Sequence, residues 1–319
     1  MGNPYVRADV RRFLDELAAT PRSDMPDAGI AGMRAGYRAM AAAVDAPIGE
    51  LAVMRTVQVE VAPNRSIAAR LFDPRATRPP GPALVFCHGG GFVFGDLDTY
   101  ASLCAALARG LDWPVIAVDY RLAPEHPWPA APDDVEAAAR RIASHADVFE
   151  REFTGLVLAG DSAGGALAVI TAIALRDDPA ALPVSGLCLM YPTTDLFGQY
   201  QSAKDLDGRF MTSVGKFNWL VEQYRPDPGH WRAAPMLADL RGLPPTLVMP
   251  AGLDPFRDQG RAWAKACIDA GVPVICHERP GTIHGHLGFR KAIPSANDDL
   301  AWLVASLTAM VGTSPNESR

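Results

Sequence analysis

The chain has 319 residues, of which 49% are hydrophobic and 21% charged, and its formal net charge is −6 at pH 7. A chain of this length and composition can bury a large core, so we expect one large domain rather than a string of small ones. The charges are spread without a block of lysine and arginine, which argues against a nucleic-acid partner and against an anionic membrane surface. Small neutral or apolar molecules remain as the expected partners.

The cysteines form no Cys-x-x-Cys pair, are odd in number and lie mostly in apolar stretches. They are Cys87, Cys104, Cys188, Cys267 and Cys276. Thiols in such stretches behave as small core residues, so we expect neither a disulfide framework nor a zinc site. The opening MGNPYVRADVRRFLDEL lacks the apolar segment of a signal peptide, and no apolar run reaches the length of a membrane span. We therefore expect a soluble, cytoplasmic protein.

The pattern of apolar and polar residues changes near Ala83. An alanine-rich, helical segment (6–44) precedes two alternating stretches, VMRTVQVEV and SIAARLF, which predict an antiparallel hairpin with its turn at Pro63-Asn64. From Ala83 onward, apolar runs alternate with helix-like segments, and each run precedes a polar or glycine-containing loop. The runs are ALVFC, PVIAVDY, GLVLA, GLCLM, PTLVMP and PVICHE. This alternation is typical of a mostly parallel sheet covered by helices on both faces.

One connection is longer than an ordinary crossover requires, because about fifty residues separate YPTTD from the strand near Thr246. Its large aromatic residues include Phe210, Phe217, Trp219, Tyr224 and Trp231. We interpret this insertion and the N-terminal helices as a lid over the carboxyl ends of the strands, where open α/β sheets bind ligands. The predicted division is 1–50 for N-terminal cap helices, 197–232 for the cap insertion, and 51–196 with 233–312 for the core.

The stretch LVLAGDSAGGALAVITAIAL (156–175) places a polar turn between a strand-like run and an apolar run of helical length. Within it, GDSAG from Gly160 to Gly164 matches Gly-x-Ser-x-Gly, the nucleophile elbow. A serine at this apex holds strained backbone angles, and its flanking glycines let strand and helix pass closely. The pattern also occurs by chance, but the helix dipole after Ser162 would favour negative charge developing there. We predict Ser162 as the nucleophile.

The stretch ALVFCHGGGF puts three glycines directly after a predicted strand. The HGGG motif lines the oxyanion hole of lipases and esterases, because successive glycine N–H groups can turn toward a ligand without a Cβ in the way. We predict that the N–H groups of Gly89, Gly90 and Ala163 form this hole. We interpret His88 as a residue that holds the loop by hydrogen bonds rather than as a catalyst.

A serine of ordinary pKa needs a base and an orienting carboxylate, which follow the serine in the order Asp, His in this type of fold. TLVMPAGLDPFRD brings Asp254 to a loop at the carboxyl edge of the sheet, and RPGTIHGHLGF brings His284 there after the next strand. Asp195 is the second candidate for the acid, and Asp258 lies further into a helix. Asp161, beside the serine, is interpreted as a partner of the histidine loop.

His284 and His286 compete for the role of the base, and the residues alone leave the choice open. The His-x-His pair is also compatible with half of a metal site. No third ligand stands at a recognisable spacing, however, and an elbow enzyme with an HGGG loop needs no metal. We therefore predict a site without metal and without cofactor.

With HGGGF, DYRLAPEHPWPAAPDD, GDSAGG, LDPFRD and IHG in this order, the sequence resembles the hormone-sensitive lipase-like esterases, bacterial family IV of the lipolytic enzymes. The resemblance runs from about Val53 to Leu307. It implies an α/β-hydrolase fold with a mostly parallel eight-stranded sheet flanked by helices, and a helical cap built from the N-terminus and an insertion after the sixth strand. It also implies hydrolysis of carboxylic esters, usually with short acyl chains.

The resemblance implies a role for each matching position of the site. Ser162 matches the nucleophile, Asp254 of LDP the acid, and His284 of IHG the base. The oxyanion donors are implied to be Gly89, Gly90 and Ala163. Members of the family usually read HGF where this chain has HGH, so we expect His286 to make the surroundings of the base more polar.

Two further expectations come from the resemblance. YRLAPEHPWPA (120–130) is interpreted as scaffold, and the resemblance suggests cis peptide bonds within it. Related enzymes often pair through the last strand, here near Pro273 to Glu278, so a homodimer is expected.

The sequence therefore predicts a serine hydrolase that cleaves esters of short to medium acyl chains through an acyl-enzyme intermediate. The expected partners are a small ester and water. An amidase or lactonase is an alternative, because a triad and an oxyanion hole serve any acyl transfer. A ligand-binding pseudoenzyme is a more distant alternative: plant hormone receptors similar to this family have lost the catalytic histidine, whereas Ser162, Asp254 and His284 are all present here.

Overall fold

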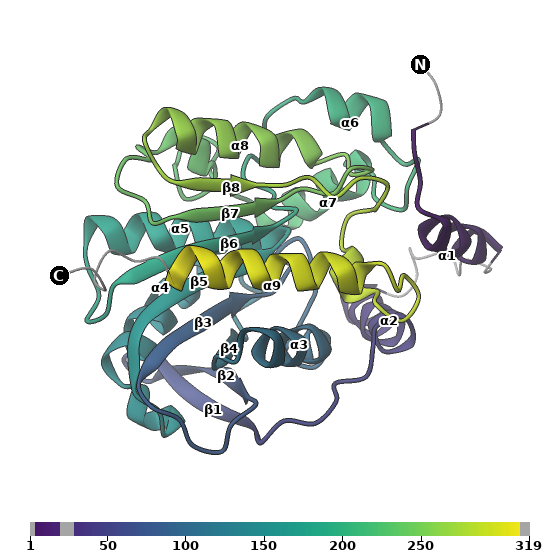
Figure 1. Ribbon diagram of the computed structural model, residues 1–319. Helices are drawn as coiled ribbons and strands as arrows, with labels where there is room; N and C mark the ends of the chain where they lie inside the picture. The colour runs from purple at the N-terminus through teal and green to yellow at the C-terminus, as the bar shows by residue number, and fades with distance from the viewer. Residues whose placement is uncertain (1–3, 20–28, 313–319) are drawn as a thin grey trace.

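The computed structural model describes residues 4–19 and 29–312, and its centre is a sheet in the order β1-β2-β4-β3-β5-β6-β7-β8 (Figure 1). The strands are β1 (Val53–Ala62), β2 (Arg65–Asp73), β3 (Gly81–Cys87), β4 (Val115–Val118), β5 (Phe153–Asp161), β6 (Val184–Met190), β7 (Thr246–Met249) and β8 (Val274–Cys276). The predicted hairpin is β1 and β2, which pair antiparallel. Each predicted apolar run forms one of the strands β3 to β8.

The sheet is mostly parallel, as the alternation of apolar runs with helix-like segments predicted. β2 runs antiparallel to β4, whereas β3 pairs in parallel with β4 and β5, and β6, β7 and β8 continue the parallel pairing from β5. Parallel strands need crossover connections, and helices supply them here. The predicted α/β-hydrolase architecture with an eight-stranded, mostly parallel sheet is confirmed.

Helices cover both faces of the sheet, which explains why its central strands are apolar on both sides. In β3, Leu84 and Phe86 pack against α3 and α9, while Val85 and Cys87 pack on the face of α4, α5 and α8. These helices are α3 (Ala101–Leu111), α4 (Ala130–Ser144), α5 (Ala163–Asp177), α8 (Arg257–Asp269) and α9 (Ala296–Gly312). Figure 1 shows α3 and α9 in front of the sheet.

The remaining α-helices lie toward one end of the strands, at the right of Figure 1. They are α1 (Ala8–Ala19) and α2 (Gly29–Val44) from the N-terminal part, and α6 (Gln201–Leu206) and α7 (Val214–Tyr224) from the insertion between β6 and β7. Val10 and Phe13 of α1 share a buried cluster with Leu206 and Phe210 of the insertion. The two cap segments therefore pack together, while the boundaries proposed for them remain a prediction.

The structure also bears on the proline-rich segment 120–130, on the edge strand β8 and on the expected absence of a membrane span. The peptide bonds before Pro124 and Pro129 are cis, within the segment where the resemblance suggested them. β8 is an edge strand of the sheet, so the strand proposed for dimerisation is open to pairing, and the homodimer remains a prediction. Among the described residues, no helix is long and apolar enough to cross a membrane.

Candidate active site

The turn between β5 and α5 holds Ser162 in a strained conformation, with φ at 52° and ψ at −120°. A residue with a side chain rarely adopts a positive φ, and surrounding contacts must hold it there. The Ser162 N–H donates to Met190 O at 2.9 Å, and its carbonyl accepts from the N–H groups of Gly165 and Thr193. This is the sharp strand-to-helix turn that the sequence pattern predicted.

The glycines on either side of Ser162 allow strand and helix to approach each other. A Cβ on Gly164 would overlap with the carbonyl oxygen of Cys87 at the end of β3, and a Cβ on Gly160 would overlap with the carbonyl of Gly164. In both cases the obstacle is backbone, which cannot rotate away as a side chain can. The close approach of strand and helix, and not only the turn, requires glycine at these positions.

Gly164→Ala is expected to lower the free energy of unfolding by about 3 kcal/mol or more, because the added methyl group must displace the backbone of β3. Chemical denaturation in urea measures this change. Gly312→Ala is the matched control, since a Cβ there meets no atom of the described residues within 4 Å. Equal stability of the two variants would contradict the explanation of the motif by close approach.

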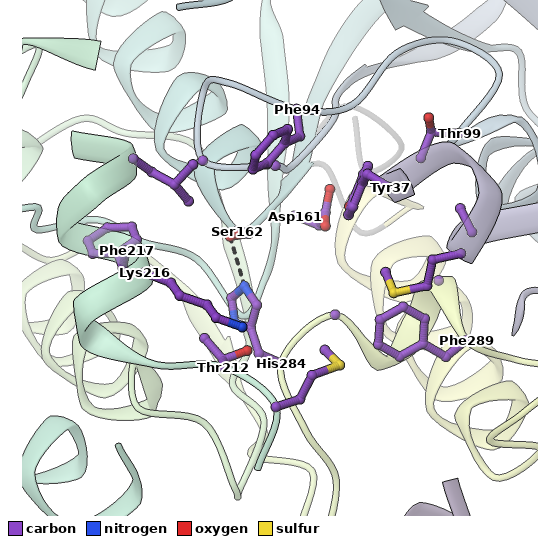
Figure 2. A pocket seen from close by; sticks show the side chains of 18 of the residues that line it. Tyr37, Phe94, Thr99, Asp161, Ser162, Thr212, Lys216, Phe217, His284 and Phe289 are labelled. Atoms are coloured by element: carbon purple, nitrogen blue, oxygen red, sulfur yellow. Dashed lines mark hydrogen bonds between the residues drawn. The ribbon is translucent and has the colours of Figure 1, made fainter. Parts of the chain in front are cut away.

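Three side chains from three loops meet at the carboxyl edge of the sheet. His284 Nε2 lies 2.8 Å from Ser162 Oγ, a contact that Figure 2 marks with a dashed line, and His284 Nδ1 lies 2.6 Å from Asp254 Oδ2. Asp254 is fully buried, and its other oxygen accepts a hydrogen bond from the N–H of Phe256 at 2.8 Å. With the ring proton on Nδ1, the imidazole donates to Asp254, and its Nε2 accepts from the serine hydroxyl.

The pKa of His284 is raised above its usual value. Burial alone would lower it, but the negative charge and hydrogen bond of Asp254 and the charge of Asp161 outweigh burial. The raised pKa favours the protonated ring, so His284 can accept the proton of Ser162 and remain as imidazolium. This arrangement can activate a serine hydroxyl as a nucleophile.

The other two candidates for the acid, Asp195 and Asp258, form contacts away from His284. Asp195 accepts hydrogen bonds within its own loop, including one from the hydroxyl of Tyr200 at 2.8 Å. Asp258 accepts a hydrogen bond from the backbone N–H of Ser202 and pairs with arginines on α8. Among the described residues, neither carboxylate contacts His284. Asp254 is therefore the acid that the geometry brings to this imidazole.

His286 faces away from the reaction centre. Its ring is fully buried, with Nδ1 3.0 Å from Ile283 O and Nε2 3.0 Å from Asp299 Oδ2. It is not one of the residues that line the cavity around Ser162. The sequence-based expectation that His286 makes the surroundings of the base more polar therefore has no support in the geometry of the cavity.

Asp299 joins His286 to the N-terminal segment of the chain. This buried carboxylate also pairs with Arg7 at 2.7 Å and with Arg279 at 2.5 Å. Burial raises the pKa of Asp299, but the hydrogen bonds and charges of His286 and Arg7 outweigh it and hold the pKa well below its usual range. The cluster anchors the loop that carries His284 to the segment that precedes α1.

The HGGG loop differs in one respect from the prediction. The N–H of Gly89 already donates to Asp161 Oδ1 at 2.6 Å, so this donor is engaged inside the protein. Gly90 and Gly91 line the cavity with φ of 110° and 62°. In the part of the chain that the structure describes, the N–H groups of Gly90, Gly91 and Ala163 meet no acceptor. Gly91, the third glycine of the motif, was not among the donors predicted from the sequence, and it lines the cavity.

Asp161 holds the HGGG loop to the end of β5. Besides the Gly89 N–H, it accepts a hydrogen bond from the Tyr100 hydroxyl at 3.2 Å, and Tyr100 in turn contacts the Tyr37 hydroxyl of α2 at 3.1 Å. Burial raises the pKa of Asp161 to about 6, partly offset by the Gly89 N–H and by His284. From the sequence, Asp161 was expected to be a partner of the histidine loop, which carries His284. Its hydrogen bonds go instead to Gly89 and Tyr100, and its negative charge acts on His284.

His88 is part of the scaffold beneath this loop. Its ring stacks on Tyr120 with centroids 4.3 Å apart, and its Nδ1 lies 2.8 Å from Gly89 O. Burial lowers the pKa of His88 to about 4, so the ring is neutral at physiological pH. His88 therefore holds the loop by packing and hydrogen bonding, as expected from the sequence.

A cavity of about 710 Å³ opens above Ser162 (Figure 2). Most of its lining is apolar and comes from α2, the HGGG loop, α7 and the loops after β7 and β8. The large apolar and aromatic residues that line the cavity are Met33, Tyr37, Met40, Phe94, Tyr100, Leu103, Met211, Phe217, Trp219, Leu220, Phe256 and Phe289. Of the aromatic residues singled out in the insertion, Phe217 and Trp219 line the cavity, whereas Phe210, Tyr224 and Trp231 do not.

Several known proteins with similar sequences are esterases. The family model of the α/β-hydrolase fold named Abhydrolase_3 matches residues 84–288. The carboxylic ester hydrolase LipN of Mycobacterium tuberculosis is 37% identical over 271 residues, which are 82% of this chain and 71% of LipN. Ethyl acetate hydrolase of Pseudomonas putida is 33% identical over 251 residues, 76% of this chain and 79% of that protein.

A solved structure with the same fold is that of an ester hydrolase from the metagenome of Lake Arreo. It superposes with a TM-score of 0.90 at 34% sequence identity and covers 97% of this chain and 100% of its own. The fold, the motifs and these relatives agree. The protein is a carboxylic ester hydrolase, and it belongs to the Abhydrolase_3 family of hormone-sensitive lipase-like esterases with the α/β-hydrolase fold.

Proposed function

We propose that the protein hydrolyses esters of short to medium acyl chains with Ser162 as nucleophile, His284 as general base and Asp254 as the orienting acid. The observation that carries the proposal is the continuous chain of contacts from Asp254 through His284 to Ser162 Oγ, at 2.6 and 2.8 Å. The strained backbone of Ser162 directs its hydroxyl into this contact.

In the first half-reaction, His284 Nε2 takes the proton of Ser162 while Oγ forms a bond to the ester carbonyl carbon. The carbonyl electron pair moves to oxygen, and collapse of this intermediate breaks the bond to the alcohol, which leaves with the proton from His284. In the second half-reaction, water gives its proton to His284 and attacks the acyl carbon, and Ser162 leaves with that proton. Asp254 holds the imidazole in the tautomer whose Nε2 can accept the proton.

The oxyanion of both intermediates is assigned to the N–H groups of Gly90, Gly91 and Ala163. Two observations support this choice over the predicted use of Gly89: the Gly89 N–H already donates to Asp161, and Gly90 and Gly91 both line the cavity. The N-terminus of α5 adds partial positive charge beside Ser162. Fixed donors of this kind stabilise developing negative charge without reorganisation.

The proposed acyl preference rests on the cavity and on the relatives. The cap segments and the HGGG loop supply an apolar wall around Ser162, which favours small apolar groups. The names of two similar proteins, ethyl acetate hydrolase of Pseudomonas putida and acetyl-hydrolase of Streptomyces hygroscopicus, describe short acyl groups. Both points support short-chain esters as substrates of this protein.

Across p-nitrophenyl esters from acetate to palmitate, kcat/KM is expected to peak between roughly two and six acyl carbons. Each methylene that fits adds up to about 0.8 kcal/mol of burial, and longer chains must displace packed side chains or remain in water. Measurement of initial rates below the micellar concentration tests this. Rates that continue to rise to palmitate, or that jump at the micellar concentration, would contradict the proposed acyl preference.

A further inference from the structure

The cavity contains one cationic side chain without an internal partner. Lys216 is the only lysine or arginine among the described residues that line it. The other ionisable groups there are satisfied within the protein: Asp45 pairs with Arg290 through two contacts of 2.9 Å, and Asp161 holds the HGGG loop. Lys216 forms no ion pair with a carboxylate in the part of the chain that the structure describes. Its charge is therefore available to a ligand.

The position of Lys216 is set by the first turn of α7. Its backbone N–H donates to the hydroxyl of Ser213, the residue before the helix, at 3.2 Å. Thr212 and Ser213 line the cavity beside it. In Figure 2, the amine end of Lys216 points into the cavity on the side of Ser162 where His284 and Thr212 lie.

We infer that Lys216 is a specificity-determining residue that binds a carboxylate of the substrate, so that the preferred esters are acidic: short esters with a second, free carboxylate a few carbons from the ester. This inference rests on the proposed ester hydrolysis and names its substrate class. The cavity lining as a whole is mostly apolar, so a neutral chain gains from burial alone, whereas an acidic chain also gains an ion pair at its far end.

The charges around the cavity favour this pairing. Lys216 is exposed in the free enzyme, so its ammonium remains hydrated and the enzyme does not bury an unpaired charge while it awaits substrate. A substrate carboxylate would replace part of this water in a site of lower dielectric than bulk solvent, where opposite charges attract more strongly. Of the nearby carboxylates, Asp45 is neutralised by its ion pair with Arg290. Asp161 and Asp254 are buried and accept hydrogen bonds from within the protein.

Two pairs of substrates test the inference. Monoethyl glutarate carries the carboxylate on the acyl side, and its neutral isostere is the ethyl ester of glutaric monoamide. 4-Acetoxybutanoate carries the carboxylate on the alcohol side, and its isostere is 4-acetoxybutanamide. The measured quantity is the ratio of kcat/KM for the acidic ester to kcat/KM for its amide at low ionic strength. We expect a ratio of about three or more in at least one pair, and a lower ratio in 0.5 M salt.

Substitutions of Lys216 and Lys204 distinguish an effect of the charge inside the cavity from an effect of the protein's net charge. Lys216→Met should bring the ratio close to one, and Lys216→Arg should keep most of it, because arginine retains the charge. Lys204→Met removes the same charge from α6 of the same insertion, at an exposed position outside the cavity. It should leave both the ratio and the activity unchanged.

A ratio near one in both pairs for the unmodified enzyme would overturn the inference, and so would an equal fall in Lys204→Met and Lys216→Met. Failure of the proposed function would look different. In that case neither the amides nor ethyl butyrate would be hydrolysed, whereas failure of this inference alone leaves the neutral esters as good substrates.

Discussion

Ser162→Ala is expected to lower kcat for p-nitrophenyl butyrate by about four to six orders of magnitude, because the residues of a triad act as a unit. The fold should remain intact. The contacts that hold the elbow, from the Ser162 N–H to Met190 O and from Gly165 and Thr193 to the Ser162 carbonyl, are made by the backbone and do not involve the hydroxyl. Steady-state kinetics and thermal denaturation of the purified variant measure the two quantities.

Ser185→Ala is the matched control for this substitution. Its hydroxyl donates to Leu156 O at 3.2 Å near the start of β6 and lies outside the cavity, so activity should stay within about twofold of wild type. If Ser162→Ala keeps more than about a hundredth of the wild-type activity, well above what the oxyanion hole and binding alone leave, Ser162 is not the nucleophile.

His284→Ala is expected to be nearly as severe as loss of the nucleophile, because it removes the acceptor that lies 2.8 Å from Ser162 Oγ. His286→Phe should behave differently. It removes contacts with Asp299 and Ile283 O in a buried cluster, so it should lower the free energy of unfolding while the folded enzyme stays within about tenfold of wild-type activity. The opposite ranking of the two variants in kcat would contradict the assignment of the base.

The pH profile gives an independent test of the same base. Only neutral imidazole can accept the Ser162 proton, so activity should fall as the pH drops through the pKa of His284. That pKa lies above its ordinary value, because Asp254 and Asp161 outweigh burial. Asp254→Asn should shift this acid limb to lower pH by removing a negative charge, and should also lower kcat by about four orders of magnitude. An unmoved acid limb in Asp254→Asn would contradict the coupling.

Much of the fold could be predicted from short stretches of the sequence. Apolar runs followed by glycine or polar loops predicted β3 to β8. The central strands among them are buried on both faces and must be apolar throughout, whereas the edge strand β8 is only partly buried. The strained turn at Ser162 could be predicted equally well. The glycines that make it possible, Gly160 and Gly164, lie within two positions of Ser162. These features depend on neighbours along the chain.

Other features depend on contacts between distant segments, which local pattern does not contain. Ser162 and His284 lie 122 positions apart and Asp254 and His284 lie 30 apart, so the meeting of their side chains is decided by packing. The residues alone left His284 and His286 as equal candidates, and the resemblance favoured His284. The structure shows the physical difference: one ring faces Ser162, and the other is held inside by Asp299.

The sequence by itself determined the sheet, the elbow, the glycine loop and the family, because each is encoded in a short stretch of residues with a strict steric or burial requirement. Only the tertiary structure decided that Asp161 engages the Gly89 N–H, that Phe217 and Trp219 rather than Phe210 face the cavity, and that Lys216 stands there unpaired. These outcomes depend on the directions of side chains and on which groups their neighbours already occupy. Such directions are set when the cap and core segments pack together.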